Sequence, residues 1–344
     1  MSDASTKAAS LKFQIPPGID QEHGRMKQIY NLLPSLSGRE IVQCIKERDR
    51  FLIEALQFSG TYNTTLSMRQ QQDLLKNGII DACLGVFKFP ETIDRERDLN
   101  EPTLACILGI LGNLLVYGRL QASFLNPYRV EICQKLAPTI LLCSTKKHRL
   151  LGLMEEWWIV HAAFNSLVRN CLAAGEEAFV LLTSLDPIVI TKGLLEYTVV
   201  QLTVDPKMYL RRKRTFISEN TLVRGALVCK MTAIPILATL VSFRDSTTRQ
   251  IGLMKVPAGA TLAGRTFASC FLQVAATIVG EALNSGQAHR IDQPLTAQIK
   301  LIYSMLLKVP SLEELLGGHD AELGNLRTPL QLREGAKKKL ASTA

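Results

Sequence analysis

The segment "ACILGILGNLLVYG" (residues 105–118) carries apolar residues at helical spacing and ends in Gly, the residue that most readily closes a helix in the left-handed conformation. A shift of 57 residues lays it over "AAFNSLVRNCLAAG" (residues 162–175). Ala105 then falls on Ala162, Asn113 on Asn170 and Leu115 on Leu172, and both segments end in Gly. We interpret the two segments as equivalent helices of an internal repeat, which predicts an all-α fold.

A second set of helices obeys the same shift. It lays "IIDACLGVF" (79–87) on "LAPTILLCS" (136–144) and then on "GLLEYTVVQ" (193–201). Residues 66–205 therefore resemble armadillo- or HEAT-type helical repeats. "NGIIDACLGVFKFPE" is similar to the third helix of an armadillo unit, and "NEPTLACILGILGNLL" is similar to the second helix. The resemblance implies a stack of helices that binds a protein partner along a concave face. The period exceeds the roughly 40–47 residues of those families, and charged loops at 88–102 and 144–156 would supply the excess.

Further helices are predicted on both sides of this repeat-like segment. "REIVQCIKERDRFLIEALQF" (39–58) reads as one helix, with Ser37 as N-cap and Glu40 completing a capping box. Beyond residue 205 the pattern changes, and helices are expected over 219–243, with Pro235 inside, and over 268–286, 295–308 and 311–318. We predict a flexible N-terminal arm (1–25), a repeat-like lobe (26–205), a differently built basic helical lobe (206–318) and a flexible C-terminal tail (319–344).

The positive charge is concentrated in one part of the chain. The 344 residues carry a formal net charge of +9, and the window from Lys207 to Arg265 holds eleven Lys and Arg but only two acids, Glu219 and Asp245. Such asymmetry indicates an anionic partner. The candidate polyanion- or RNA-binding residues are Lys207, Arg211, Arg212, Lys213, Arg214, Arg224, Lys230, Arg244, Arg249, Lys255 and Arg265.

No motif for catalysis, metal binding or a cofactor is recognisable. The eight cysteines are scattered singly, without the C-x-x-C spacing of zinc or redox sites, and are expected to be reduced core residues. His161 lies in an apolar helix and reads as a core histidine, and neither phosphate-binding loop motif occurs. The adjacent Trp157 and Trp158 are either core packing or a hot spot for a partner. We therefore expect a protein that is not an enzyme.

The start of the chain, "MSDASTKAASLKF", lacks the apolar core of a secretory signal. The most apolar run, residues 103–118, is shorter than the roughly 20 residues that span a bilayer and is interrupted by Asn113. These patterns predict a cytoplasmic protein without a membrane span.

Two hypotheses for function remain open. One is a helical scaffold or adaptor that engages an acidic protein partner through a basic concave surface. The other is an RNA-binding protein of the viral nucleoprotein kind, which coats single-stranded RNA in a basic cleft between two helical lobes. In that second case the terminal arms would join copies into a homo-oligomer, an analogy of layout alone.

Overall fold

The computed structural model describes residues 31–62, 66–86, 101–116, 120–143, 158–183, 193–203, 219–256, 262–285 and 293–316. The predicted all-α fold is confirmed: throughout these ranges the regular elements are helices, and the one extended pairing is an isolated antiparallel bridge between Lys255 and Thr266. The chain divides into two compact units, unit 1 (Met1–Leu182) and unit 2 (Thr183–Ala344).

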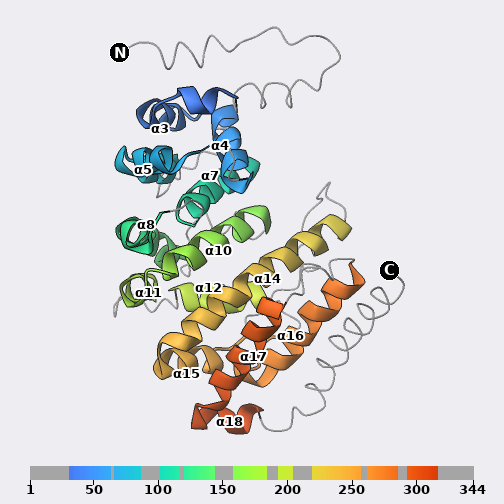
Figure 1. The fold of residues 1–344 in the computed structure, drawn as a ribbon. Coiled ribbons are helices and arrows are strands. Elements are labelled where there is room, and N and C mark those ends of the chain that lie inside the picture. Colours follow the sequence, from blue (N-terminus) through green and yellow to red (C-terminus); the bar gives the residue numbers. More distant parts are fainter. Residues whose placement is uncertain are drawn as a thin grey trace, which may run out of the picture. The chain divides into compact units, whose positions relative to one another are not determined.

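Unit 1 is built from helices of unequal length, from the 8-residue α6 to the 22-residue α8 (Figure 1). Its elements are η1 (Leu33–Ser35), α3 (Gly38–Lys46), α4 (Arg50–Tyr62), α5 (Met68–Lys76), α6 (Ile79–Val86), α7 (Glu101–Leu114), α8 (Ala122–Cys143), α10 (Trp158–Leu172) and α11 (Glu176–Thr183).

The junction between α3 and α4 corrects one prediction. Ser37 and Glu40 form the expected capping box, but the single helix predicted over 39–58 is broken after Lys46. Arg48 adopts a left-handed φ of 61°, and the Asp49 N–H donates to the Cys44 carbonyl, which closes α3 as Gly usually does. Asp49 then starts α4, because its Oδ1 accepts the Leu52 N–H at 3.0 Å. The apolar stripe is still buried across the break, from Ile41 to Leu56.

The core of unit 1 lies along a row of three helices, in which α7 packs against both α4 and α10. Asn170 Nδ2 of α10 donates to the Gly112 carbonyl of α7 at 3.1 Å. Between α5 and α3, the Asp73 carboxylate accepts the Gly38 N–H at 2.7 Å and thereby helps to cap α3. This row is compatible with the 57-residue register, and the repeat itself stays a prediction.

Unit 2 is organised around one long helix. It contains α12 (Gly193–Thr203), α14 (Glu219–Phe243), α15 (Asp245–Leu253), α16 (Phe267–Asn284), α17 (Gln293–Leu307) and α18 (Pro310–Leu316) (Figure 1). α14 contacts α12, α15, α16 and α17, and it contains Pro235 as predicted. The division between the two compact units falls after Leu182, and α12 packs against α14 within unit 2. The predicted lobes 26–205 and 206–318 stay a prediction.

Two helices of unit 2, Val223–Phe243 and Phe267–Asn284, are long and apolar enough to cross a membrane by length and composition alone. Within their most apolar windows, 67% and 56% of the residues are buried, and a core helix passes the same test. The absence of a membrane span stays a prediction. The predicted arm (1–25) and tail (319–344) lie outside the described residues.

Candidate functional site

The described residues include six of the eleven predicted polyanion-binding positions. Lys207, Arg211, Arg212, Lys213 and Arg214 lie outside them, in the undescribed segment 204–218. Arg224, Lys230, Arg244, Arg249, Lys255 and Arg265 all belong to unit 2.

Four of these cations gather around α15, and we call them the α15 basic cluster: Arg244, Arg249, Lys255 and Arg265. Arg244 is the N-cap residue of α15, Arg249 lies within the helix, and Lys255 follows directly after its C-cap residue. All four side chains are exposed. A helix of nine residues is only about 13 Å long, so the first three positions lie close together.

Backbone hydrogen bonds place the fourth cation, Arg265, next to Lys255. The Val256 N–H donates to the Arg265 carbonyl at 2.8 Å, and the Phe267 N–H donates to the Met254 carbonyl at 2.8 Å. These bonds flank the bridge between Lys255 and Thr266 and set Arg265 beside Lys255. Within 244–256 and 262–267, Asp245 is the one carboxylate.

The start of α16 adds positive potential to the α15 basic cluster. Arg265 donates through Nη1 to Gln273 Oε1 at 3.2 Å and through Nη2 to the Ser269 carbonyl at 3.0 Å, which fixes its guanidinium near the first turn of α16. That turn contains no acidic residue, and its N-cap Thr266 makes no side-chain capping bond. A cation at the positive end of a helix dipole is unfavourable by roughly 0.3–1 kcal/mol, and a bound carboxylate would offset that cost.

The other two described cations do not join the cluster. Arg224 is exposed but lies twenty residues before Arg244 on α14, about 30 Å along a helix. Lys230 is only 5% exposed, and its Nζ lies 3.6 Å from Glu281 Oε2 of α16. Lys230 is therefore a core residue and is removed from the predicted surface. Glu281 is the one acidic residue in the apolar α16, but the sequence does not show that it pairs with Lys230.

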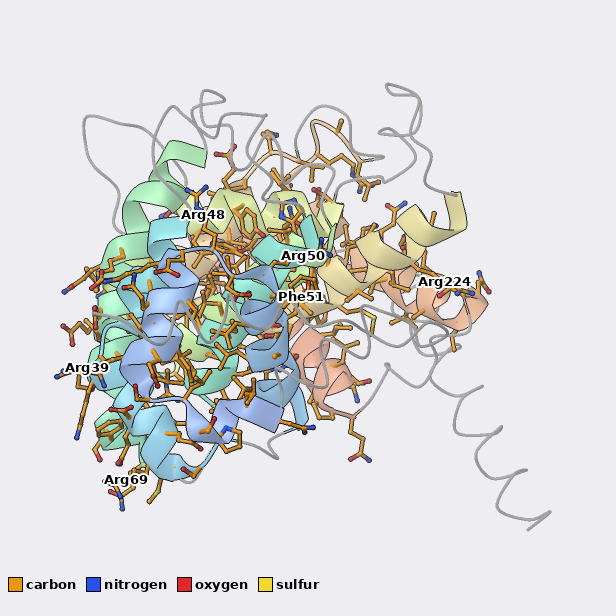
Figure 2. All side chains as sticks on the ribbon, turned by 90° about the horizontal axis from the view of Figure 1, so that it is seen from above. Arg39, Arg48, Arg50, Phe51, Arg69 and Arg224 are labelled. Atoms are coloured by element: carbon orange, nitrogen blue, oxygen red, sulfur yellow. The ribbon has the colours of Figure 1, made fainter. Side chains whose placement is uncertain are left out.

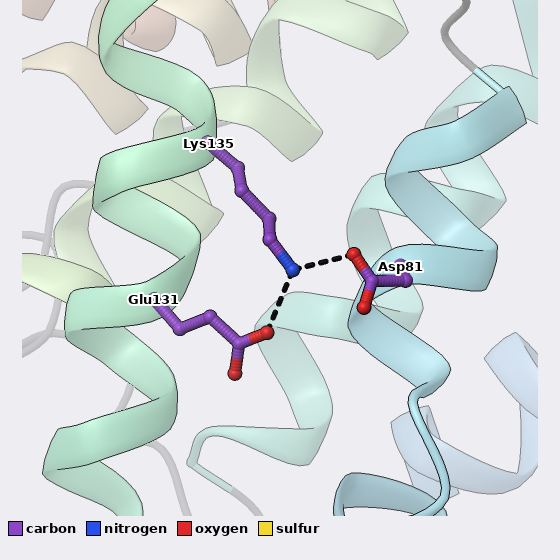
Figure 3. Close-up of polar contacts among 3 residues, drawn as sticks. All are labelled: Asp81, Glu131 and Lys135. Atoms are coloured by element: carbon purple, nitrogen blue, oxygen red, sulfur yellow. Dashed lines mark hydrogen bonds and ion pairs between the residues drawn. The ribbon is translucent and has the colours of Figure 1, made fainter.

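The cations of unit 1 are arranged differently. Lys135 of α8 donates to Asp81 of α6 at 2.5 Å and to Glu131 at 2.7 Å (Figure 3). Arg50 pairs with Glu54 at 2.7 Å. Figure 2 shows that Arg39 and Arg69 lie well away from Arg48 and Arg50, so the labelled arginines of unit 1 form no single patch.

Burial shifts the pKa values of His161 and of several cysteine thiols among the described residues. His161 is 2% exposed, as predicted for a core histidine, and burial lowers its pKa to about 3. Burial raises the pKa of Cys44 and of Cys106 to about 11, and that of Cys83 further. Thiols with raised pKa values are poor nucleophiles. No group of His, Cys, Asp and Glu able to hold a metal ion occurs among the residues with described positions.

The remaining predicted contacts are at the start of α10. Trp157 lies outside the described residues, and Trp158 is the first residue of α10, with its side chain undescribed. The resemblance of 66–205 to armadillo or HEAT repeats stays a prediction. The chain matches no protein-family model, no curated protein and no solved structure.

Proposed function

We propose that this chain is a non-catalytic helical binding protein that engages an acidic partner protein through the α15 basic cluster. One observation carries the proposal: Arg244, Arg249, Lys255 and Arg265 are exposed around one short helix, with Asp245 as the single carboxylate in the same segments. Cations on a surface with few carboxylates attract an anionic partner and accelerate its association.

The chemistry of the cluster favours carboxylates over single-stranded RNA. Proteins that hold single-stranded nucleic acid combine cations with exposed aromatic rings on which bases stack. Within 244–256 and 262–267 the one aromatic residue is Phe267, which is fully buried. An acidic protein segment needs no such ring.

Unit 1 supports the scaffold part of the proposal. Its helix α7 packs against both α4 and α10, and we propose that these helices belong to a repeat array of the kind that presents long surfaces to partner proteins. In this proposal unit 2 supplies the charged contact, and unit 1 offers a helical surface of its own.

Fluorescence anisotropy with two labelled polyanions tests this function. Poly-L-glutamate should bind the wild-type protein more tightly than poly-uridylate at equal ionic strength. The triple variant Arg244→Glu, Arg249→Glu and Lys255→Glu should bind poly-L-glutamate about tenfold or more weakly, with an unchanged circular dichroism spectrum. Equal binding by the variant would end the assignment of the cluster, and a preference for poly-uridylate would favour the nucleoprotein-type function instead.

A further inference from the structure

An open groove runs between α14 and α17 within unit 2. We call it the α14–α17 groove, and its volume is about 320 Å³. It is lined by Pro235, Ala238, Thr239, Ser242 and Phe243 of α14 and by Gln298 and Leu301 of α17.

The wall that α14 contributes has small side chains, and their hydroxyl groups are already hydrogen-bonded within the helix. Ala238, Thr239 and Ser242 are small, and both hydroxyls donate within the helix: Thr239 Oγ1 to the Pro235 carbonyl at 2.9 Å and Ser242 Oγ to the Ala238 carbonyl at 2.7 Å. Their donors are therefore not offered to a ligand. Pro235 has no N–H to present. On the opposite wall, Leu301 remains 40% exposed although it lies beside this apolar surface.

The groove is bordered by cations. Arg244 directly follows Phe243 and is exposed. Lys308 directly follows α17, where its N–H donates to the Ser304 carbonyl at 3.3 Å, and its Nζ lies 3.8 Å from Met305 Sδ. Residues 223–243 and 293–308 contain no Asp or Glu. An occupant of this groove meets largely apolar walls, with Arg244 next to one wall and Asp245 as the adjacent carboxylate.

We propose that the α14–α17 groove binds a short amphipathic segment of the partner, with apolar side chains on one face and carboxylates on the other. The inference rests on the proposed function and names the chemistry of the partner. A volume of about 320 Å³ accepts a few apolar side chains, which is how helices dock in grooves. The carboxylates would pair with Arg244 and Lys308.

Charge complementarity favours a partner protein in the groove over the chain's own C-terminal segment or a second copy of the chain. The chain's own C-terminal segment, residues 317–344, contains five Lys and Arg against three Asp and Glu. A second copy of the chain would bring a net charge of +9. Either one would place positive charge against a positive border.

Selection from a random peptide library tests the inference without presupposing a sequence. The full-length wild-type protein is immobilised and used to select phage-displayed peptides of about sixteen residues, long enough for four helical turns. Enriched peptides should carry net negative charge and apolar residues at three- and four-residue spacing. Their affinities are then measured by anisotropy for Leu301→Asp, for the groove-filling Ser242→Trp, and for the control Leu307→Asp. Leu307 is on the same helix, is 39% exposed and does not line the groove.

The groove variants should each weaken binding about tenfold, and the control should change it less than twofold. Enriched peptides that bind all three variants equally would overturn the groove assignment but leave the acidic-partner function standing. Enrichment of neutral or basic peptides, or no enrichment, would overturn both.

Discussion

Unit 1 and unit 2 contain the same number of cations, 20 Lys and Arg each, yet unit 1 has 19 Asp and Glu and unit 2 has 12. The basic character of unit 2 therefore arises from missing carboxylates rather than from added cations. In unit 1, Lys135 is held by Asp81 and Glu131 (Figure 3), whereas the α15 basic cluster has Asp245 alone in its segments. We use this difference in composition to propose where an anionic partner binds.

The two units also differ in where they place an ion pair. Arg50 and Glu54 of unit 1 lie on one helix, and the Arg50 side chain is 46% exposed. Lys230 and Glu281 of unit 2 join two apolar helices, with the Lys230 side chain only 6% exposed. Exposed pairs contribute little to stability, but a buried charge that loses its partner is strongly destabilising.

Removing one partner from each ion pair should affect stability far more in unit 2 than in unit 1. Glu281→Ala should lower the free energy of unfolding by about 3 kcal/mol, at the low end for a broken buried pair because the Glu281 side chain keeps 30% exposure. Glu54→Ala in unit 1 should cost less than about 1 kcal/mol. Urea denaturation followed by circular dichroism measures both, and equal losses would remove the distinction between the two pairs.

Acid should destabilise unit 1 through His161. Burial lowers the pKa of His161 to about 3, against 6.5 in an unfolded chain. Below pH 6.5 the unfolded state therefore binds a proton that the folded state does not bind. The stability is complete above pH 6.5 and falls by up to about 1.4 kcal/mol per pH unit below it, which is about 2 kcal/mol at pH 5. Both tryptophans belong to unit 1, so their fluorescence during urea denaturation reports on this unit.

In the matched variant His161→Leu, the fall in the free energy of unfolding below pH 6.5 that is caused by the histidine should be absent. If wild type and variant lose the same stability between pH 7 and pH 5, the histidine is not buried in its neutral form and the account of this core is wrong.

A smaller and opposite effect is expected at the α3–α4 junction. Arg48 has a φ of 61°, a left-handed conformation that costs a residue with a side chain about 1 kcal/mol relative to Gly. Arg48→Gly should therefore stabilise unit 1 by up to about 1 kcal/mol, measured as a higher urea midpoint of tryptophan fluorescence. Arg39→Gly, in the first turn of α3, is the control and should destabilise. A lower midpoint for Arg48→Gly would contradict the left-handed closure of α3.

Local signals in the sequence predicted much of the fold. Ser37 and Glu40 marked the start of α3, and the long apolar pattern around Pro235 predicted α14. The break at Arg48 could not be predicted, because nothing in Arg distinguishes a left-handed residue from a helical one. The burial of Lys230 depends on Glu281, fifty-one residues away, and spacing along one helix carries no such information.

The sequence predicted which residues carry the positive charge, but not how they are arranged in space. The charged window was visible in the sequence, but its division into a cluster and two separate residues was not. Arg265 reaches Lys255 through backbone bonds across a connection between helices, and Arg224 is separated from Arg244 by the length of α14. The groove arises from packing between α14 and α17, which no local pattern encodes.

Equal charge changes in the two units test whether an acidic partner binds at a defined place in unit 2. Poly-L-glutamate affinity is measured against salt concentration for the wild type, for Arg244→Glu with Arg249→Glu and Lys255→Glu in unit 2, and for Arg39→Glu with Arg69→Glu and Arg169→Glu in unit 1. All six residues are exposed. The unit 2 triple variant should lose about tenfold in affinity and most of the salt dependence, while the unit 1 triple variant should stay within about twofold of wild type. Equal losses in both triples would show that binding follows net charge alone and would contradict a site in unit 2.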